Sequence, residues 1–257
     1  MEHPVWADAA GDAANTTMLL VHGSMDRSAG LLRLSRRLDH CRHVLRFDRR
    51  GYGRSRSVGP PWTVAANVDD AEALIAGVAG RVDVVGHSFG GNVALALAER
   101  RPDLIRSVTV YETPLSWLDW WPGNSAGGAA MAAGSAGDAA EAFMRRLVGD
   151  SVWERLPAAR QQERRAEGAA MLAELADLRA APPWSAAAIE APVLVLVGAH
   201  ARGHHEAAGS WLVEQLPSAR HRVIPDAGHA GPHTHADAVG VEIARFLTAV
   251  GAGGAGD

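Results

Sequence analysis

The feature that most constrains this chain is a serine between two glycines, in the segment Gly86-His87-Ser88-Phe89-Gly90. A valine-rich run at residues 82–85 precedes it, and a helix-forming run at residues 92–100 follows it. A serine on a sharp strand-to-helix turn needs small residues two positions before and after it, because larger side chains collide across the turn. We therefore predict that Ser88 has a strained backbone at the carboxyl edge of a sheet, facing the positive end of the next helix. The alternative is an ordinary glycine-rich turn in which the serine is incidental.

Short apolar runs alternate with longer amphipathic ones along the chain. This alternation predicts an α/β protein with a mostly parallel central sheet and helices on both faces. The predicted strands cover residues 18–21, 43–47, 82–85, 107–111, 193–197 and 221–224. The predicted helices cover residues 26–38, 64–78, 89–100, 207–216 and 236–250.

Residues 115–186 interrupt this alternation. They are rich in alanine, carry arginine and glutamate at helical spacing, and contain no strand-like run. We predict that they form a helical cap insertion in a core made of residues 1–114 and 187–257. Within the insertion, the low-complexity residues 123–137 are expected to form a loop or a poorly ordered helix.

Three tryptophans of the insertion, Trp117, Trp120 and Trp121, have the i, i+3, i+4 spacing of a helical stripe. The stripe has two compatible interpretations. It packs the insertion onto the core, or it forms an apolar wall over Ser88 that binds an acyl or aromatic group. Met25 is assigned to the same substrate-binding wall.

Composition excludes several classes of protein. A net charge of −4 and a pI of about 6.3 do not indicate a nucleic-acid or anionic-membrane partner. Residues 1–17 lack a signal-peptide pattern, and no apolar run approaches the roughly 20 residues of a membrane span. The single cysteine, Cys41, cannot form an intrachain disulfide, so we expect a cytoplasmic protein. All 25 basic residues are arginine, which excludes lysine-based catalysis and a P-loop lysine.

A serine nucleophile needs a base and an oxyanion hole. His229 follows Gly228 in the loop after the predicted strand at residues 221–224, from which it can reach Ser88. The first oxyanion donor is the main-chain N–H of Phe89. The second comes from the loop after residues 18–21, where Ser24 is the favoured donor and Met25 is the alternative.

These motifs together resemble the α/β-hydrolase fold superfamily, in its cap-bearing serine hydrolase form. The resemblance rests on His22-Gly23, the turn at residues 48–55, the Ser88 segment and Gly228-His229, in the order that the family has them. It implies that the turn at residues 48–55 shapes the rim of the site, that no cofactor is needed, and that the substrate is a small molecule. It also implies a pair of N-terminal strands, which is hard to see in residues 1–17.

The chain departs from the family in the acid that orients the histidine. The loop after residues 193–197 contains no carboxylate before Glu206, and Ala201 stands about where the family has an aspartate. Glu112, directly after the predicted strand at residues 107–111, can supply the acid instead and preserves the order serine, acid, histidine. Two alternatives remain open: Glu112 is a rim residue paired with an arginine, or the acid is missing or comes from elsewhere. Asp226 is too close to His229 in sequence to face it easily.

A group of histidines invites a metal-binding interpretation, because His200 and His204 are four residues apart. Gly203 interrupts this pair, however, and no nearby carboxylate or cysteine completes a ligand set. We therefore expect solvated loop histidines and no metal. The histidines in question are His200, His204, His205, His233 and His235.

The sequence supports a serine hydrolase of esters, thioesters or lactones with an apolar acyl group. A serine on this strand-to-helix turn argues against epoxide hydrolase or dehalogenase chemistry, because the resembled fold uses an aspartate at the same turn for those reactions. Two alternatives remain. One is a weakly active ligand-binding relative, and the other is a non-hydrolytic enzyme that catalyses acyl transfer, carbon–carbon cleavage or lyase chemistry. The sequence indicates neither the oligomeric state nor the substrate.

Overall fold

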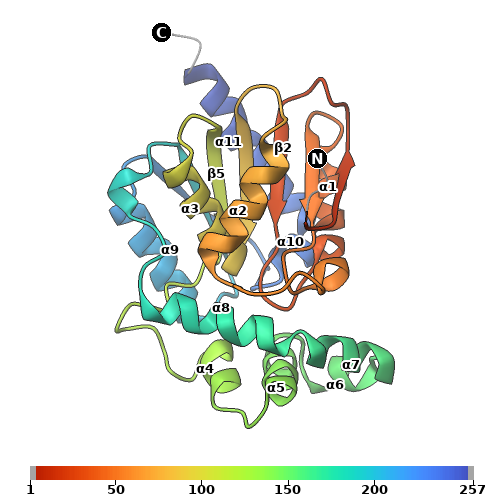
Figure 1. Ribbon diagram of the computed structural model, residues 1–257. Helices are drawn as coiled ribbons and strands as arrows, with labels where there is room; N and C mark the ends of the chain where they lie inside the picture. Colours follow the sequence, from red (N-terminus) through yellow and green to blue (C-terminus); the bar gives the residue numbers. More distant parts are fainter. Residues whose placement is uncertain (1–3, 254–257) are drawn as a thin grey trace.

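The structure, a computed structural model, describes residues 4–253. Its centre is a seven-stranded sheet with the strand order β1-β3-β2-β4-β5-β6-β7 (Figure 1). Neighbouring strands are parallel except β1 and β3, which are antiparallel, so the predicted mostly parallel sheet is confirmed. The strands are β1 (Ala7–Ala10), β2 (Thr17–Val21), β3 (His43–Phe47), β4 (Val82–His87), β5 (Ile105–Tyr111), β6 (Val193–Gly198) and β7 (Ala219–Ile224).

Helices cover both faces of the sheet, as predicted. Those on one face pack around Leu19 and Val21 of β2, and those on the other pack around Met18 and Leu20 of the same strand. Because successive side chains of a strand point to opposite faces, β2 is buried on both sides and its carboxyl end has a fixed position. The first face carries α2 (Val64–Ile75), α3 (Phe89–Arg100) and α9 (Gly203–Gln215); the second carries α1 (Leu32–Leu38) and α11 (Ala236–Gly253).

Between β5 and β6 the chain forms five further α-helices, which Figure 1 shows gathered at one end of the sheet in green to cyan. Glu174 of the last of them pairs with Arg49, which lies just after β3. The carboxyl ends of the central strands therefore face this segment. The division of the chain into a core and a cap stays a prediction. The five helices are α4 (Ala126–Met131), α5 (Ala136–Val148), α6 (Asp150–Arg155), α7 (Ala158–Ala166) and α8 (Gly168–Ala180).

The strand β1 is not apparent in the sequence. Its residues are alanine and aspartate, which are depleted in strands, and three of the four are exposed. β1 is an edge strand that depends on main-chain pairing with β3 rather than on side-chain burial. No helix among residues 4–253 is both long and apolar enough to cross a bilayer.

Two helices begin at positions that differ from the prediction. The helix predicted from residue 26 is replaced at its start by a loop, because Met25 has a φ of 59° and Asp26 is paired with His233. A short 3-10 helix, η1 (Ser28–Leu31), then leads into α1. Conversely, α9 begins four residues earlier than predicted, so that His205 lies in its first turn. The earlier start of α9 changes which side chains lie at the candidate active site.

Candidate active site

Ser88 lies on the turn between β4 and α3, with φ and ψ of 53° and −123°. Few non-glycine residues adopt a positive φ, so the strained turn that the sequence predicts is present. The flanking glycines are required for close packing: a Cβ at Gly86 would lie 2.3 Å from the carbonyl oxygen of Gly90, and one at Gly90 would lie 2.2 Å from that of Val21. The main-chain N–H of Ser88 donates to the carbonyl of Tyr111 across a distance of 2.9 Å, which fixes the turn against β5.

Glu112 lies directly after β5, and its side chain is fully buried. Its Oε2 lies 2.8 Å from Nδ1 of His229, and its Oε1 accepts the main-chain N–H of Gly198 at 3.1 Å. A carboxylate can only accept, so Nδ1 of His229 carries the proton and Nε2 is left free to accept another. No arginine pairs with Glu112 in the described part of the chain, so the alternative of a rim residue paired with an arginine is wrong.

Main-chain strain is concentrated around these residues. Within residues 4–253, the non-glycine residues with positive φ are Met25, Ser88, Glu112 and Asp226. Each lies in the loop that follows a different strand of the sheet: β2, β4, β5 and β7 respectively. Strain of this kind persists only where the surrounding structure over-determines it, and it is frequent at functional sites.

The two proposed oxyanion donors both lie at this edge of the sheet. Neither the N–H of Ser24 nor that of Phe89 has an acceptor among the hydrogen bonds of the described residues. The loop after β2 approaches the turn closely: a Cβ at Gly23 would be 3.0 Å from Cβ of Ser88. Both donors are therefore available to a substrate oxygen next to Ser88. The choice between Ser24 and Met25 as second donor stays a prediction.

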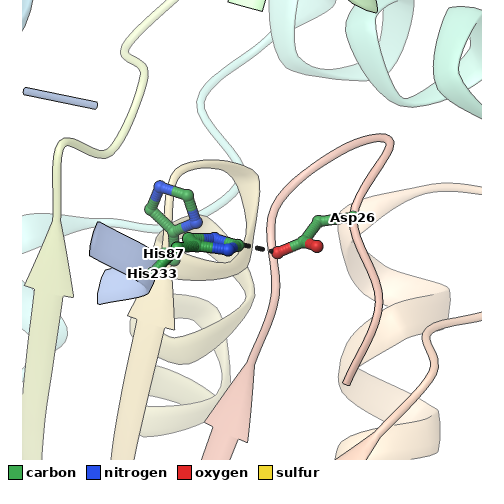
Figure 2. A group of neighbouring side chains, drawn as sticks. All are labelled: Asp26, His87 and His233. Atoms are coloured by element: carbon green, nitrogen blue, oxygen red, sulfur yellow. Dashed lines mark ion pairs between the residues drawn. The ribbon is translucent and has the colours of Figure 1, made fainter. Parts of the chain in front are cut away.

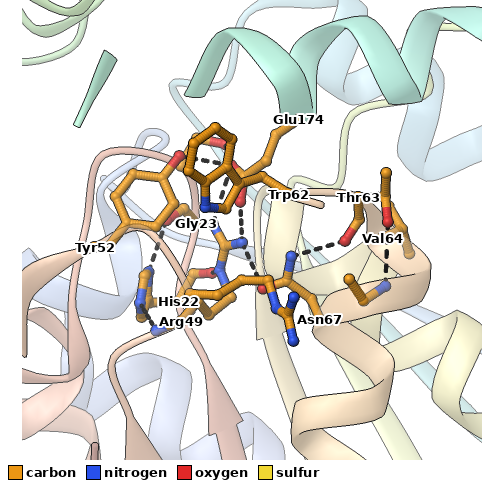
Figure 3. Close-up of polar contacts among 12 residues, drawn as sticks. His22, Gly23, Arg49, Tyr52, Trp62, Thr63, Val64, Asn67 and Glu174 are labelled. Atoms are coloured by element: carbon orange, nitrogen blue, oxygen red, sulfur yellow. Dashed lines mark hydrogen bonds and ion pairs between the residues drawn. The ribbon is translucent and has the colours of Figure 1, made fainter. Parts of the chain in front are cut away.

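A buried polar network connects α8 to this edge of the sheet (Figure 3). At its centre, Glu174 pairs with Arg49, and both side chains are fully buried. Oε2 of Glu174 also accepts from the hydroxyl of Ser24 at 2.8 Å and from that of Tyr52 at 2.7 Å. The guanidinium of Arg49 stands 4.5 Å from the ring centre of Phe89. Glu174 of α8 therefore contacts one proposed donor residue, Ser24, directly. It reaches the other, Phe89, through Arg49.

His22 completes the network on the core side. Its Nδ1 lies 2.7 Å from the carbonyl of Gly23, and its Nε2 accepts the main-chain N–H of Arg49 at 2.9 Å. Burial, reinforced by the charge of Arg49, lowers the pKa of His22 to about 3, so the ring is neutral. His22 thus acts as a fixed neutral link between the loops after β2 and β3.

His205 is buried, and its ring stacks on that of His229 with centres 4.7 Å apart and planes inclined by 20°. Its neighbour His204 contacts Trp121 edge-on. Burial lowers the pKa of both His204 and His205, strongly for His205. The expectation of solvated loop histidines is therefore wrong for these two, because α9 begins at Gly203 and turns His205 toward the site.

A second pair of histidines, His87 and His233, lies near His229. Nε2 of His87 lies 2.8 Å from the carbonyl oxygen of His229, and the ring of His233 packs against His87. His233 in turn forms a 3.2 Å ion pair with Asp26, which Figure 2 shows, so the expectation of a solvated loop histidine is wrong for His233 too. Burial lowers the pKa of His87 well below its ordinary value, whereas the bond to Asp26 outweighs burial and raises the pKa of His233.

Two groups of three side chains lie close enough together to hold a metal ion. They are Asp26, His87 and His233, and Glu112, His205 and His229. In each group two members already partner each other, as the ion pair between His233 and Asp26 and the hydrogen bond between His229 and Glu112. Two of the three members of each group therefore have a partner without an ion, whereas Nδ1 of His87 and Nδ1 of His205 are buried without a hydrogen bond in the described structure.

A cavity opens at Ser88 and His229, and Ser24, Phe89 and Trp121 also line it. The other residues predicted to contact substrate lie elsewhere. Trp117 packs edge-on against Trp184, Trp120 is 43% exposed, and Met25 is buried among helices of the α4–α8 segment. The predicted stripe does not form because residues 117–121 are a series of turns rather than a helix.

Sequence reasoning missed four residues that shape the site: Arg49, Tyr52, Glu174 and His205. Arg49 and Tyr52 lie in the turn at residues 48–55, which the family resemblance had marked as structural. Glu174 carries no signal, because it is one of several glutamates on an alanine-rich helical segment. His205 could have been found only by placing the start of α9 correctly.

The sequence matches the model of the alpha/beta hydrolase family over residues 18–240. The chain belongs to the α/β-hydrolase family. Over 103 residues it is 36% identical to lipase LipV of Mycobacterium tuberculosis. That alignment covers 40% of this chain and 39% of the lipase, so the chain spans about two fifths of the length of this curated relative.

Two solved structures of hydrolases have the same fold. One is a thermophilic esterase from Thermogutta terrifontis, with a TM-score of 0.76 and 24% identity over 96% of this chain and 93% of the esterase. The other is an enol-lactonase from Burkholderia xenovorans, with a TM-score of 0.75 and 26% identity over 95% of this chain and 96% of the lactonase. These similarities extend over nearly the whole chain, including the α4–α8 segment.

Proposed function

We propose that the protein is a serine hydrolase that cleaves a carboxylic ester, thioester or lactone through an acyl-enzyme intermediate. The observation that carries this proposal is the hydrogen bond between the buried Glu112 and His229, at the cavity that Ser88 also lines. A serine on a strained turn, an imidazole oriented by a carboxylate and two free N–H groups are the parts that acyl transfer requires.

In this mechanism Oγ of Ser88 attacks the carbonyl carbon while Nε2 of His229 takes the hydroxyl proton. Glu112 keeps the other proton on Nδ1 and stabilises the imidazolium that forms. The carbonyl oxygen, now negative, accepts hydrogen bonds from the N–H groups of Ser24 and Phe89. His229 then protonates the leaving alcohol or thiol. Water, losing its proton to the same nitrogen, releases the acid and restores Ser88.

The relatives support ester chemistry, since one is named a lipase and another an enol-lactonase. Trp121 and the aliphatic side chains of the α4–α8 segment give the cavity an apolar wall that suits an acyl group. A carboxylate after β5 replaces the one that the family usually has after β6.

The test compares turnover of p-nitrophenyl butyrate by wild type, Glu112→Gln and Glu206→Gln, with Ser88→Ala as blank. Glu206 is the matched control, because it is an exposed carboxylate in the first turn of α9, after β6. We expect kcat to fall about 10²-fold or more in Glu112→Gln, since an unoriented imidazole is a poor base, and to change less than about twofold in Glu206→Gln. Circular dichroism verifies that each variant is folded.

Equal activity of Glu112→Gln and wild type would remove Glu112 from the mechanism. Activity of the wild type no higher than the blank, with no labelling of Ser88 by a fluorophosphonate, would contradict the serine hydrolase altogether. The ligand-binding and non-hydrolytic alternatives would then be favoured.

A further inference from the structure

The lining of the active-site cavity has an unbalanced charge. It includes three arginines, Arg146, Arg179 and Arg202, and neither an aspartate nor a glutamate. None of the three forms an ion pair within residues 4–253. Four apolar side chains, Phe143, Leu147, Leu175 and Leu178, also line the cavity. The cavity therefore presents positive charge next to the proposed nucleophile.

Arg179 differs from every other arginine in the described chain. All the other buried or half-buried arginines pair with a carboxylate, as Arg49 does with Glu174 and Arg50 with Asp70. Arg179 is only half-buried and has no such partner; its guanidinium makes long contacts, of 3.3 Å to the carbonyl of Leu175 and 3.4 Å to the hydroxyl of Ser125. Burial lowers the pKa of Arg179, and no acid opposes this.

The Arg179 side chain packs against a neighbouring segment of the chain. A Cβ at Gly127 would lie 3.4 Å from each of its two terminal nitrogens, so the guanidinium rests against the start of α4. Ser125 and Gly127 themselves line the cavity. A guanidinium placed beside apolar walls without a counter-ion costs free energy, and a ligand that brings the missing negative charge recovers it.

The two remaining arginines lie nearer the solvent and link the two sides of the opening. Arg202, just before α9, donates to the carbonyl of Arg146 at the end of α5 at 3.2 Å. Arg146 donates to the carbonyl of Asn124 at 2.6 Å. Both bonds are to neutral carbonyls, so both charges remain uncompensated and raise the positive potential through which a substrate enters.

We propose that Arg179 is a specificity-determining residue that binds an ionised carboxylate of the substrate, so that the preferred ester or lactone carries a carboxylate as a second group. This inference rests on the proposed function for the identity of the reacting bond. One guanidinium carries one charge and a planar pair of donors, which matches a carboxylate in charge and shape. The second charge of a phosphate would have to be held by Arg146 or Arg202, which are exposed and already donate to main-chain carbonyls.

The test uses two substrates that differ only in charge: the mono-p-nitrophenyl ester of adipic acid, and the same ester with its free carboxylate methylated. We expect wild type to hydrolyse the free acid with a kcat/KM at least about tenfold higher than that of the methylated ester. Arg179→Gln should reduce this ratio of kcat/KM values to about twofold or less, mainly by raising the KM for the free acid. Arg179→Lys should keep part of it, because it retains the charge.

Arg155→Gln is the matched control. Arg155 is an exposed arginine of α6 with no ion pair in the described chain, and it lies outside the cavity. It should keep the wild-type preference. A wild type that prefers the methylated ester, or a preference that Arg179→Gln leaves unchanged, would overturn the proposal. A stronger preference for a matching phosphate-bearing ester would overturn the choice of carboxylate.

A binding measurement separates this proposal from the proposed function. Calorimetry of Ser88→Ala with the same two esters needs no turnover. Tighter binding of the free acid, lost in Ser88→Ala/Arg179→Gln, supports the carboxylate subsite even if the wild type hydrolyses neither ester. Equal affinities for the two esters would refute the subsite even if both are hydrolysed.

Discussion

Single residues set the geometry of the proposed site through backbone strain. Ser88 and Glu112, with φ of 53° and 45°, are the proposed nucleophile and acid. Met25 and Asp226, with φ of 59° and 57°, lie one residue after the proposed donor Ser24 and three before His229. A positive φ changes the direction of the chain abruptly. Each of these loops can therefore return its functional group toward a common centre.

Asp226 provides a test of this strain that does not remove a proposed catalytic group. Its side chain is exposed, and aspartate and asparagine tolerate a positive φ better than β-branched residues do. We expect Asp226→Val to lower the free energy of unfolding by about 1–2 kcal/mol and Asp226→Asn to change it little. Asp119→Val is the control, since Asp119 is exposed and has no positive φ. Urea denaturation measures all three, and equal losses in Asp226→Val and Asp119→Val would rule out the strain.

At the scale of elements, α8 does more than cover the end of the sheet. Glu174 contacts Ser24, Tyr52 and Arg49, which lie on the loops after β2 and β3. A fully buried ion pair gives little net stability, but each partner is costly to leave unpaired. The position of α8 and the conformation of the loop that carries Ser24 are therefore fixed together. We expect the hydroxyl of Ser24 to act as a positioning group for its own main-chain N–H.

Ser24→Ala tests this coupling, because it removes the bond to Glu174 but keeps the N–H. We expect kcat for p-nitrophenyl butyrate to fall about three- to tenfold while KM stays nearly constant, since the oxyanion forms only in the transition state. Ser116→Ala is the control: Ser116 lines the same cavity, and its side chain has no hydrogen bond in the described structure. Equal kcat values for the two variants would show that the bond to Glu174 does not position the loop.

At the scale of the whole molecule, the sequence predicted the sheet well. Buried strands such as β6 consist of valine and leucine and end in glycine, so that composition alone marks them. The strand β1 was missed because its pairing with β3 is made by main-chain atoms. The predicted tryptophan stripe was wrong because Pro114 and Pro122 bound the segment and its chain forms turns instead of a helix.

The sequence predicted those candidate site residues that local patterns mark. It missed those whose role depends on contacts with residues far away in the chain. The turn at Ser88 follows from its glycines, and the candidate acid Glu112 from its place at the end of a strand. The cavity arginines and Glu174 carry no local signal, because what distinguishes them is the presence or absence of a partner far away in sequence. Arg179 is unusual only once the partners of the other arginines are known.

The ion pair between Asp26 and His233 joins distant parts of the molecule, from the loop after β2 to α10 (Gly231–Thr234). The pair raises the pKa of His233 above its ordinary value and lowers that of Asp26. The nearby rings of His22 and His87 stay neutral, because burial lowers the pKa of each. Of these three rings, His233 is therefore the one whose charged form the fold favours.

A group whose pKa is higher in the folded than in the unfolded state stabilises the fold below its unfolded pKa, and this effect is lost as pH rises through the folded pKa. We therefore expect wild type to exceed His233→Gln in free energy of unfolding by about 1 kcal/mol at pH 5.5, and by less at pH 9. His235→Gln is the control, because the His235 side chain has no carboxylate partner in the described chain and bonds only to Thr234. Its difference from wild type should be the same at both pH values. Urea denaturation at pH 5.5 and pH 9 measures these differences. If the gap between wild type and His233→Gln did not narrow between the two, the ion pair would not connect these two loops in solution.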